Sequence, residues 1–168
     1  VYGPWQAVPG FPEERVRKAH AAYCGEVSMV DTWAGYLLRM VENMGLMEST
    51  AIIFTSDHGF YFGEHGGLFG KLSFAKHPDG TLFQRGEPGA TWDFSPLYEE
   101  IALIPLVVYV PGVTPGAFPG LTSAIDVMPT VLDIMRQEVP TWVEGQSLLP
   151  MLQDGAFPGR DFTVTTVP

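Results

Sequence analysis

The sequence predicts an α/β fold in which helices are layered on a sheet. Apolar residues recur at steps of three and four from about residue 12 to residue 44, which is the period of an amphipathic helix. Two short apolar runs, at 51–55 and 106–110, have the composition of buried strands. Because a long helix runs directly into a buried strand, we expect a layered α/β/α arrangement. A chain of 168 residues with 46% hydrophobic residues can form one domain, so we expect a single domain over 1–168.

The long helix is predicted to begin near Pro12, since proline is favoured in the first turn and two glutamates follow it. Gly45 is suited to end it, because glycine adopts the left-handed conformation of a helix C-terminus. We expect its apolar side to lie on the sheet. The residues of that side are Val16, Ala19, Tyr23, Val27, Val30, Ala34, Leu37, Leu38, Val41 and Met44.

The remaining elements follow from local composition. Residues 59–96 are rich in glycine and contain three prolines, so we expect a long irregular loop, a kind of segment that is usually functional or disordered. Asp126 is a favourable N-cap for a helix that ends near Met135. We also expect a helical turn, a short helix and an alternating strand, at 97–100, 147–152 and 162–167 respectively.

Composition restricts the possible partners. The formal net charge of -10 repels polyanions, so we expect neither nucleic acid nor an anionic membrane surface as a partner. No apolar run approaches the ~20 residues of a membrane span, and the first residues lack the pattern of a signal peptide. The single cysteine, Cys24, excludes an intrachain disulfide and a cysteine-based zinc cluster and leaves the cellular compartment open.

The candidate ligand-binding and catalytic residues follow the strand at 51–55. Ligands of open α/β sheets bind at the carboxyl ends of strands, and Asp57 and His58 leave the sheet at such an end. Both can bind one divalent cation, Ca²⁺, Mn²⁺, Mg²⁺ or Zn²⁺, although an aspartate turn beside a surface histidine is the alternative. Farther along the loop, His65 can donate a hydrogen bond or a proton, and Lys71 can contact an anionic oxygen.

Two other groups in the loop offer similar chemistry. Lys76 and His77 form a second lysine–histidine pair that chemistry alone does not separate from the first. Glu64 is a further candidate cation ligand, although an exposed glutamate is the commoner outcome.

The candidate residues belong to a series of ordered motifs: Thr-Ser-Asp-His-Gly at 55–59, Gly-Glu-His-Gly at 63–66, Phe-Gly-Lys at 69–71, Tyr-Glu-Glu at 98–100, Ile-Asp-Val-Met-Pro-Thr at 125–130, and Gly-Gln-Ser-Leu-Leu-Pro at 145–150. Together these motifs resemble the C-terminal metal-binding segment of sulfatases in the alkaline phosphatase superfamily. The resemblance covers roughly residues 20–155. It implies a fragment of a mostly parallel, alkaline-phosphatase-like sheet with flanking helices. Family members commonly have one residue fewer between the positions of His65 and Lys71.

The resemblance implies a metal-dependent hydrolase of sulfate esters. Asp57 and His58 would bind a divalent cation, most often Ca²⁺ in sulfatases, Lys71 would contact the sulfate, and His65 would lie close by. A phosphodiesterase or phosphonate monoester hydrolase of the same superfamily is an alternative. A non-catalytic binding module is another.

The chain lacks the family's nucleophile, a formylglycine made from Cys or Ser in a Cys/Ser-x-Pro-x-Arg context. Cys24 does not fit, because Glu26 and Ser28 occupy the Pro and Arg positions, and no serine fits either. We therefore expect the isolated chain to be the inactive C-terminal portion of a sulfatase catalytic domain. Uncovered apolar faces should also make it self-associate.

Overall fold

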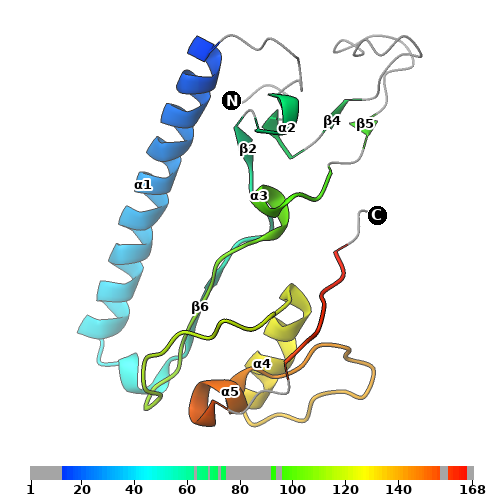
Figure 1. Ribbon diagram of the computed structural model, residues 1–168. Coiled ribbons are helices and arrows are strands. Elements are labelled where there is room, and N and C mark those ends of the chain that lie inside the picture. The colour runs from blue at the N-terminus through cyan, green and yellow to red at the C-terminus, as the bar shows by residue number, and fades with distance from the viewer. Residues whose placement is uncertain are drawn as a thin grey trace. The chain divides into compact units, whose positions relative to one another are not determined.

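The computed structural model describes residues 13–62, 64–67, 69–71, 73–74, 92–93, 96–155 and 159–165 (Figure 1). These residues form helices and short strands, as an α/β fold requires. Much of the predicted irregular loop, including Lys76 and His77, lies outside the described residues.

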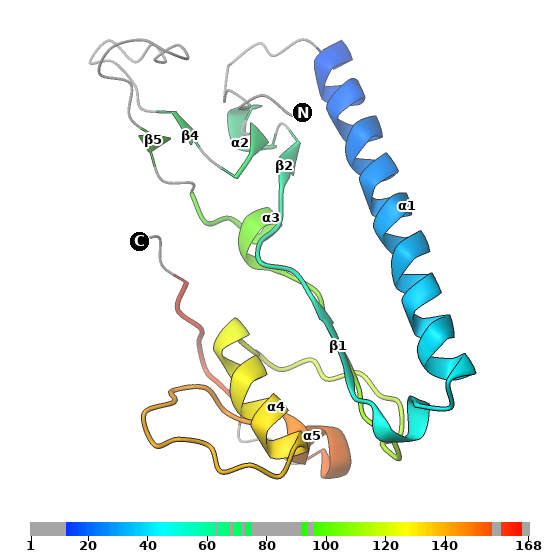
Figure 2. The ribbon, with the colours of Figure 1, turned by 180° about the vertical axis from the view of Figure 1, so that it is seen from behind.

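The described residues divide into two compact units. The first takes its residues from 13–44 and 54–107, and the second from 45–53 and 108–165. The strands β1 (Ile52–Thr55) and β6 (Leu106–Tyr109) form a two-stranded sheet and lie side by side in both ribbon views (Figures 1 and 2). Both predicted runs are therefore strands, but their expected burial is wrong: no residue of β1 or β6 is buried, and Phe54 and Val107 are 49% and 61% exposed.

The predicted long helix is α1 (Glu13–Asn43), and Gly45 follows it with a positive φ of 70°. Its N-terminal half packs on strand β2 (Tyr61–Phe62): the Tyr23 ring lies 4.8 Å from the Phe62 ring, edge to face. The expected burial of its apolar side is largely absent, because Ala19 alone among the residues of α1 is buried.

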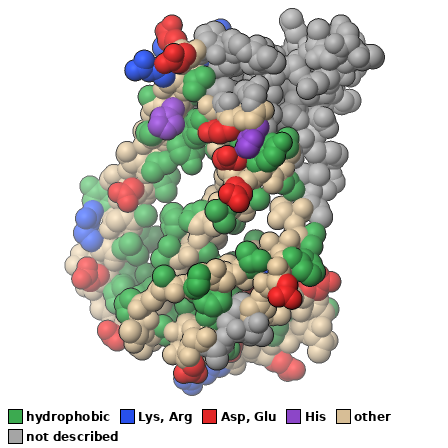
Figure 3. Space-filling model, in the orientation of Figure 1, with side chains coloured by type: hydrophobic (Ala, Val, Ile, Leu, Met, Phe, Trp, Pro, Cys, Tyr) green, Lys and Arg blue, Asp and Glu red, His purple; other side chains and the backbone are tan. Residues whose placement is uncertain are grey.

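Most of the apolar side chains of α1 face solvent. Trp33 and Leu37 are 67% and 62% exposed, and Figure 3 shows hydrophobic side chains gathered along the helix. Within the described residues, the elements next to α1 therefore leave most of its apolar side uncovered.

The rest of the first unit is built from short elements. Strand β2 pairs antiparallel with β3 (Phe69–Gly70), and the four-residue helix α2 (Glu64–Gly67) lies between them. A second antiparallel pair joins β4 (Ser73–Phe74) to β5 (Trp92–Asp93). The predicted helical turn is α3 (Glu99–Ala102), and its residue Ile101 is buried.

The second unit contains the short 3₁₀ helices η1 (Met47–Ser49) and η2 (Ala124–Asp126) and the helices α4 (Val127–Ile134) and α5 (Leu149–Asp154). Asp126 occupies the predicted N-cap position of α4, but its carboxylate caps no backbone amide of that helix. It accepts hydrogen bonds from the backbone N–H of Ser123 and Gln146, both at 2.8 Å, and from the guanidinium of Arg160. The buried carboxylate therefore joins three separate segments of the unit.

The predicted strand at 162–167 is wrong for its described part. Residues 162–165 form no strand, and their side chains are exposed. Alternation of side chains favours a strand only where a neighbouring strand accepts its hydrogen bonds, and these residues have none among the described strands. None of the helices in the described ranges combines the length and apolarity that crossing a membrane requires.

Candidate functional site

The end of β1 presents Asp57 and His58 through a tight local turn. The Ser56 hydroxyl donates to the backbone carbonyl of His58 at 2.9 Å, and the His58 backbone N–H donates to Asp57 Oδ1 at 2.9 Å. Small polar residues allow this turn because their side chains bond to nearby backbone groups instead of extending the strand. The turn fixes Asp57 and His58 next to each other.

The imidazole of His58 is held in one tautomer by its own backbone environment. Its Nδ1 lies 2.7 Å from the carbonyl oxygen of Gly59, which can only accept, so Nδ1 carries the proton. In the neutral ring Nε2 therefore presents a lone pair, and it lies 3.2 Å from Asp57 Oδ2. Two electron-pair donors, one nitrogen and one oxygen, thus converge on one point.

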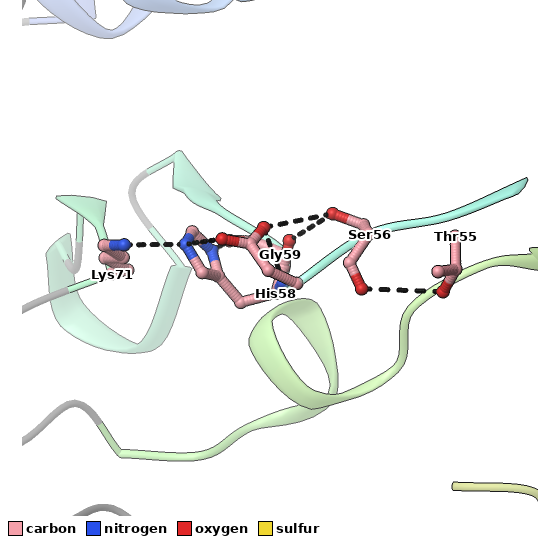
Figure 4. A network of polar contacts seen from close by, with 6 residues as sticks. Thr55, Ser56, His58, Gly59 and Lys71 are labelled. Atoms are coloured by element: carbon pink, nitrogen blue, oxygen red, sulfur yellow. Dashed lines mark hydrogen bonds and ion pairs between the residues drawn. The ribbon is translucent and has the colours of Figure 1, made fainter. Parts of the chain in front are cut away.

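Lys71 supplies the positive charge at this point. Its Nζ lies 2.8 Å from His58 Nε2 and donates to that lone pair (Figure 4). The antiparallel pairing of Tyr61 with Gly70 reverses the chain, and Gly70, with a positive φ of 73°, is followed directly by Lys71. The structure therefore brings together Asp57, His58 and Lys71, three of the four predicted site residues.

The electrostatics of the site favour an ionised Asp57. Partial desolvation acts to raise the pKa of its carboxyl group, but the charge of a protonated His58, the backbone N–H groups and Lys71 outweigh it and hold the pKa below its ordinary value. The side chain is 81% exposed, whereas that of His58 is 31% exposed. The carboxylate is thus charged and accessible to a ligand.

The donor set fits a divalent cation but does not complete its coordination shell. Carboxylate oxygens are common metal ligands. So is one nitrogen of an imidazole ring when the other ring nitrogen is hydrogen-bonded to a carbonyl. Ca²⁺ takes six to eight ligands and Zn²⁺ four. Among the described residues, no group of three or more His, Cys, Asp or Glu side chains is arranged to hold a metal ion. Asp57 and His58 can therefore provide only part of a site.

His65 lies in a different environment from Lys71. Its Nε2 is 2.9 Å from Glu100 Oε2, and its ring stacks on Tyr98 with centroids 3.7 Å apart. Glu64, the other candidate ligand, turns back to accept from the backbone N–H of Phe62 at 2.5 Å. Sequence patterns alone indicated no role for Glu100 or Tyr98, although both belong to the Tyr-Glu-Glu motif that carried the resemblance.

The backbone of helix α3 supports the site through hydrogen bonds to the residues that follow His58. The N–H of Gly59 donates to the carbonyl of Ile101 at 2.9 Å, and the N–H of Phe60 donates to that of Glu100 at 3.0 Å. A Cβ atom at Gly59 would lie 1.8 Å from the Glu100 carbonyl oxygen, so only glycine allows this approach. The residues directly after His58 are thereby fixed against α3.

Comparison with known proteins identifies the family to which the chain belongs. A family model described as "Sulfatase" matches residues 3–137. The choline-sulfatase of Rhizobium meliloti (strain 1021) is 33% identical over 143 residues, which are 83% of this chain and 23% of that protein. The multifunctional alkaline phosphatase superfamily protein PehA of Trinickia caryophylli is 32% identical over 146 residues, 85% of this chain and 24% of that protein.

A solved structure resembles the fold of this chain. The phosphonate monoester hydrolase SpPMH from Silicibacter pomeroyi superposes with a TM-score of 0.70 at 29% identity, covering 90% of this chain and 25% of that one. The fold is therefore α/β of the alkaline-phosphatase-like type. The chain spans about a quarter of the length of these relatives. Since the family model matches most of its residues, the chain belongs to the sulfatase family.

Proposed function

We propose that this chain is the part of a metal-dependent sulfate ester hydrolase that provides two cation ligands and one anion-binding lysine. The observation that supports this most is that Asp57 Oδ2 and the Nζ of Lys71 both lie next to Nε2 of His58. Because the chain belongs to the sulfatase family, we propose that these groups contribute to hydrolysis of an ester.

Each side chain has a role that its contacts support. Asp57 and His58 hold the cation; Ca²⁺ is the cation that the family resemblance implies, and the accessible carboxylate leaves room for the further oxygen ligands that it takes. When bound, the cation offsets negative charge on the ester oxygens. The lone pair of His58 cannot serve both the cation and Lys71, so the lysine ammonium is then available to donate to an oxygen of the sulfate group.

We further propose that turnover requires groups outside this chain. The sequence contains no Cys or Ser in the Cys/Ser-x-Pro-x-Arg context, and the described residues supply too few ligands for a complete shell. The isolated chain should therefore be inactive, because neither an activated nucleophile nor a fully bound cation is available to it.

A second candidate reaction is hydrolysis of a phosphonate or phosphate ester. It is favoured by the structural likeness to SpPMH, which is described as a phosphonate monoester hydrolase. The arrangement of Asp57, His58 and Lys71 suits either anion, because it recognises negatively charged oxygens and not the central atom.

Calorimetry and kinetics on the full-length polypeptide test these proposals. Titration with Ca²⁺ and with Mn²⁺ should show that Asp57→Ala weakens cation binding by at least about tenfold. Turnover of an aryl sulfate should fall with it. Asp154→Ala, which removes an exposed carboxylate elsewhere, is the matched control and should change neither.

Three outcomes would contradict the proposals. Unchanged cation binding in Asp57→Ala would show that this carboxylate is not a ligand, and would favour a non-catalytic module. Faster turnover of an aryl phosphonate monoester than of the aryl sulfate would favour the second candidate reaction. Robust turnover by the isolated chain, lost in Asp57→Ala, would refute the requirement for further groups.

A further inference from the structure

Four side chains in the first unit form a cluster that the proposed function does not use. The His65 imidazole pairs with Glu100 and stacks almost parallel on Tyr98, at an interplanar angle of 17°. The Tyr61 ring meets His65 edge to face, with centroids 6.0 Å apart. We call Tyr61, His65, Tyr98 and Glu100 the clasp.

Tyr61 anchors the clasp in the interior. It is 1% exposed, its hydroxyl donates to the backbone carbonyl of Pro96, and it accepts from the backbone N–H of Tyr98 at 3.1 Å. Buried hydroxyl groups are costly to leave unpaired, so both contacts resist displacement. The clasp therefore joins β2 and α2 firmly to the segment that leads into α3.

The backbone of His65 indicates that its side-chain contacts hold it in place. Its φ of 52° lies in the left-handed region, which residues other than glycine seldom adopt. Such conformations persist where surrounding contacts over-determine them, and they cluster at functional sites. Glu100 and Tyr98 supply those contacts here.

Simple stabilisation is a weak explanation for the clasp. The side chains of His65 and Glu100 are 33% and 37% exposed, and partly exposed ion pairs add little to stability on their own. The location of the pair suggests a better explanation. His65 lies within the chain reversal that ends in Lys71, and Glu100 lies in the helix whose carbonyls already bind Gly59 and Phe60.

We propose that Glu100 is a positioning residue that acts through His65 on Lys71. The loop that starts at His58 is fixed to α3 at two places, by the backbone bonds of Gly59 and Phe60 and by the clasp. With both attachments in place, the Nζ of Lys71 lies 2.8 Å from Nε2 of His58. His65 thus has an indirect role, in place of contact with the ester. This inference rests on the proposed function for its catalytic consequence, but not for the clasp itself.

The test compares three variants of the full-length polypeptide with an aryl sulfate as substrate. Glu100→Ala removes the partner of His65, and kcat/KM should fall by about tenfold or more while cation affinity stays within about twofold. Glu100→Gln keeps an oxygen that can accept from His65 and should recover most of the loss. Glu99→Ala is the matched control, because it removes the neighbouring exposed carboxylate and should behave as wild type.

A double-mutant cycle separates positioning from general damage to the fold. If Glu100 acts through Lys71, the variant that carries both Glu100→Ala and Lys71→Ala should be no slower than Lys71→Ala alone. Multiplicative losses in the double variant would overturn the proposal. Equal losses in Glu100→Gln and Glu100→Ala would also overturn it, because the hydrogen bond to His65 would then not matter.

Hydrogen exchange tests the clasp without reference to activity. In Glu100→Ala, amides in residues 64–71 should exchange faster than in wild type, whereas Glu99→Ala should leave them unchanged. If the wild-type protein hydrolyses no sulfate ester, the proposed function fails, and faster exchange in Glu100→Ala would still support the hold of the clasp on Lys71. Unchanged exchange in Glu100→Ala would overturn it.

Discussion

Replacing Gly59 by alanine should disrupt the support of the candidate site. The added Cβ would lie 1.8 Å from the carbonyl oxygen and 2.8 Å from the carbonyl carbon of Glu100. Both are backbone atoms, so no side-chain rotation can relieve the overlap. Helix α3 would have to move away from residues 59 and 60.

The magnitude follows from what that movement breaks. Two backbone hydrogen bonds, of 2.9 and 3.0 Å, are worth about 1–3 kcal/mol together at the usual net value for each. Overpacking typically costs about 1–3 kcal/mol. The lower chain entropy of unfolded alanine offsets about 0.4–1 kcal/mol. We therefore expect a loss of about 1–6 kcal/mol in the free energy of unfolding, a large share of the usual stability of a domain.

Chemical denaturation of the full-length polypeptide measures this loss, and hydrogen exchange of the Gly59 and Phe60 amides locates it. Gly25→Ala is the matched control. It makes the same substitution within α1, where the new Cβ meets no other atom within 4 Å, and it should stabilise the helix by about 0.5–1 kcal/mol. If Gly59→Ala changed the stability by less than about 0.5 kcal/mol with both amides still protected, the close approach of α3 would be refuted.

Three further predictions concern the rest of the chain. Asp126→Ala should cost about 3–5 kcal/mol in denaturation, because it leaves the guanidinium of Arg160 without its buried partner, and a loss no larger than that of the exposed Asp154→Ala would contradict this. The hydrogen bond from His65 lowers the pKa of Glu100 from its ordinary 4.5, so the stability that this carboxylate contributes is present above that value and is lost as the pH falls through the lowered pKa. The stability difference between wild type and Glu100→Gln should accordingly be larger at about pH 6 than at about pH 3, and an equal difference would contradict the assignment. The isolated chain should self-associate through the apolar side of α1, and Leu37→Glu should reduce its mass in light scattering, whereas a strict wild-type monomer would count against this.

The elements with strong local patterns could be predicted from the sequence. The three- and four-residue spacing of apolar side chains predicted α1, and the apolar run before Thr55 predicted β1. The same reasoning placed Asp57 and His58 at a strand end, where side chains meet ligands. The helix α5, at Leu149–Asp154, was predicted two residues too early, since local preference fixes the existence of an element better than its ends.

Burial and the fate of residues 162–165 could not be predicted from these patterns. The period of α1 predicted a covered apolar side, but cover requires a second surface, and within the described residues Leu37 and Trp33 have none large enough to bury them. Alternation at 162–165 predicted a strand, but a strand exists only through its partner.

What the sequence by itself determined is the kind of chemistry: an aspartate and a histidine after an apolar strand, and a lysine in the glycine-rich segment that follows. Only the tertiary structure decided which groups meet. Lys71 returns to His58 because a two-residue antiparallel pairing reverses the chain, and so short a strand leaves no periodic trace in the sequence. His65 is paired with Glu100, which is 35 residues away, because α3 is fixed against Gly59. Contacts between residues so distant depend on how the chain folds back, and no local preference encodes them.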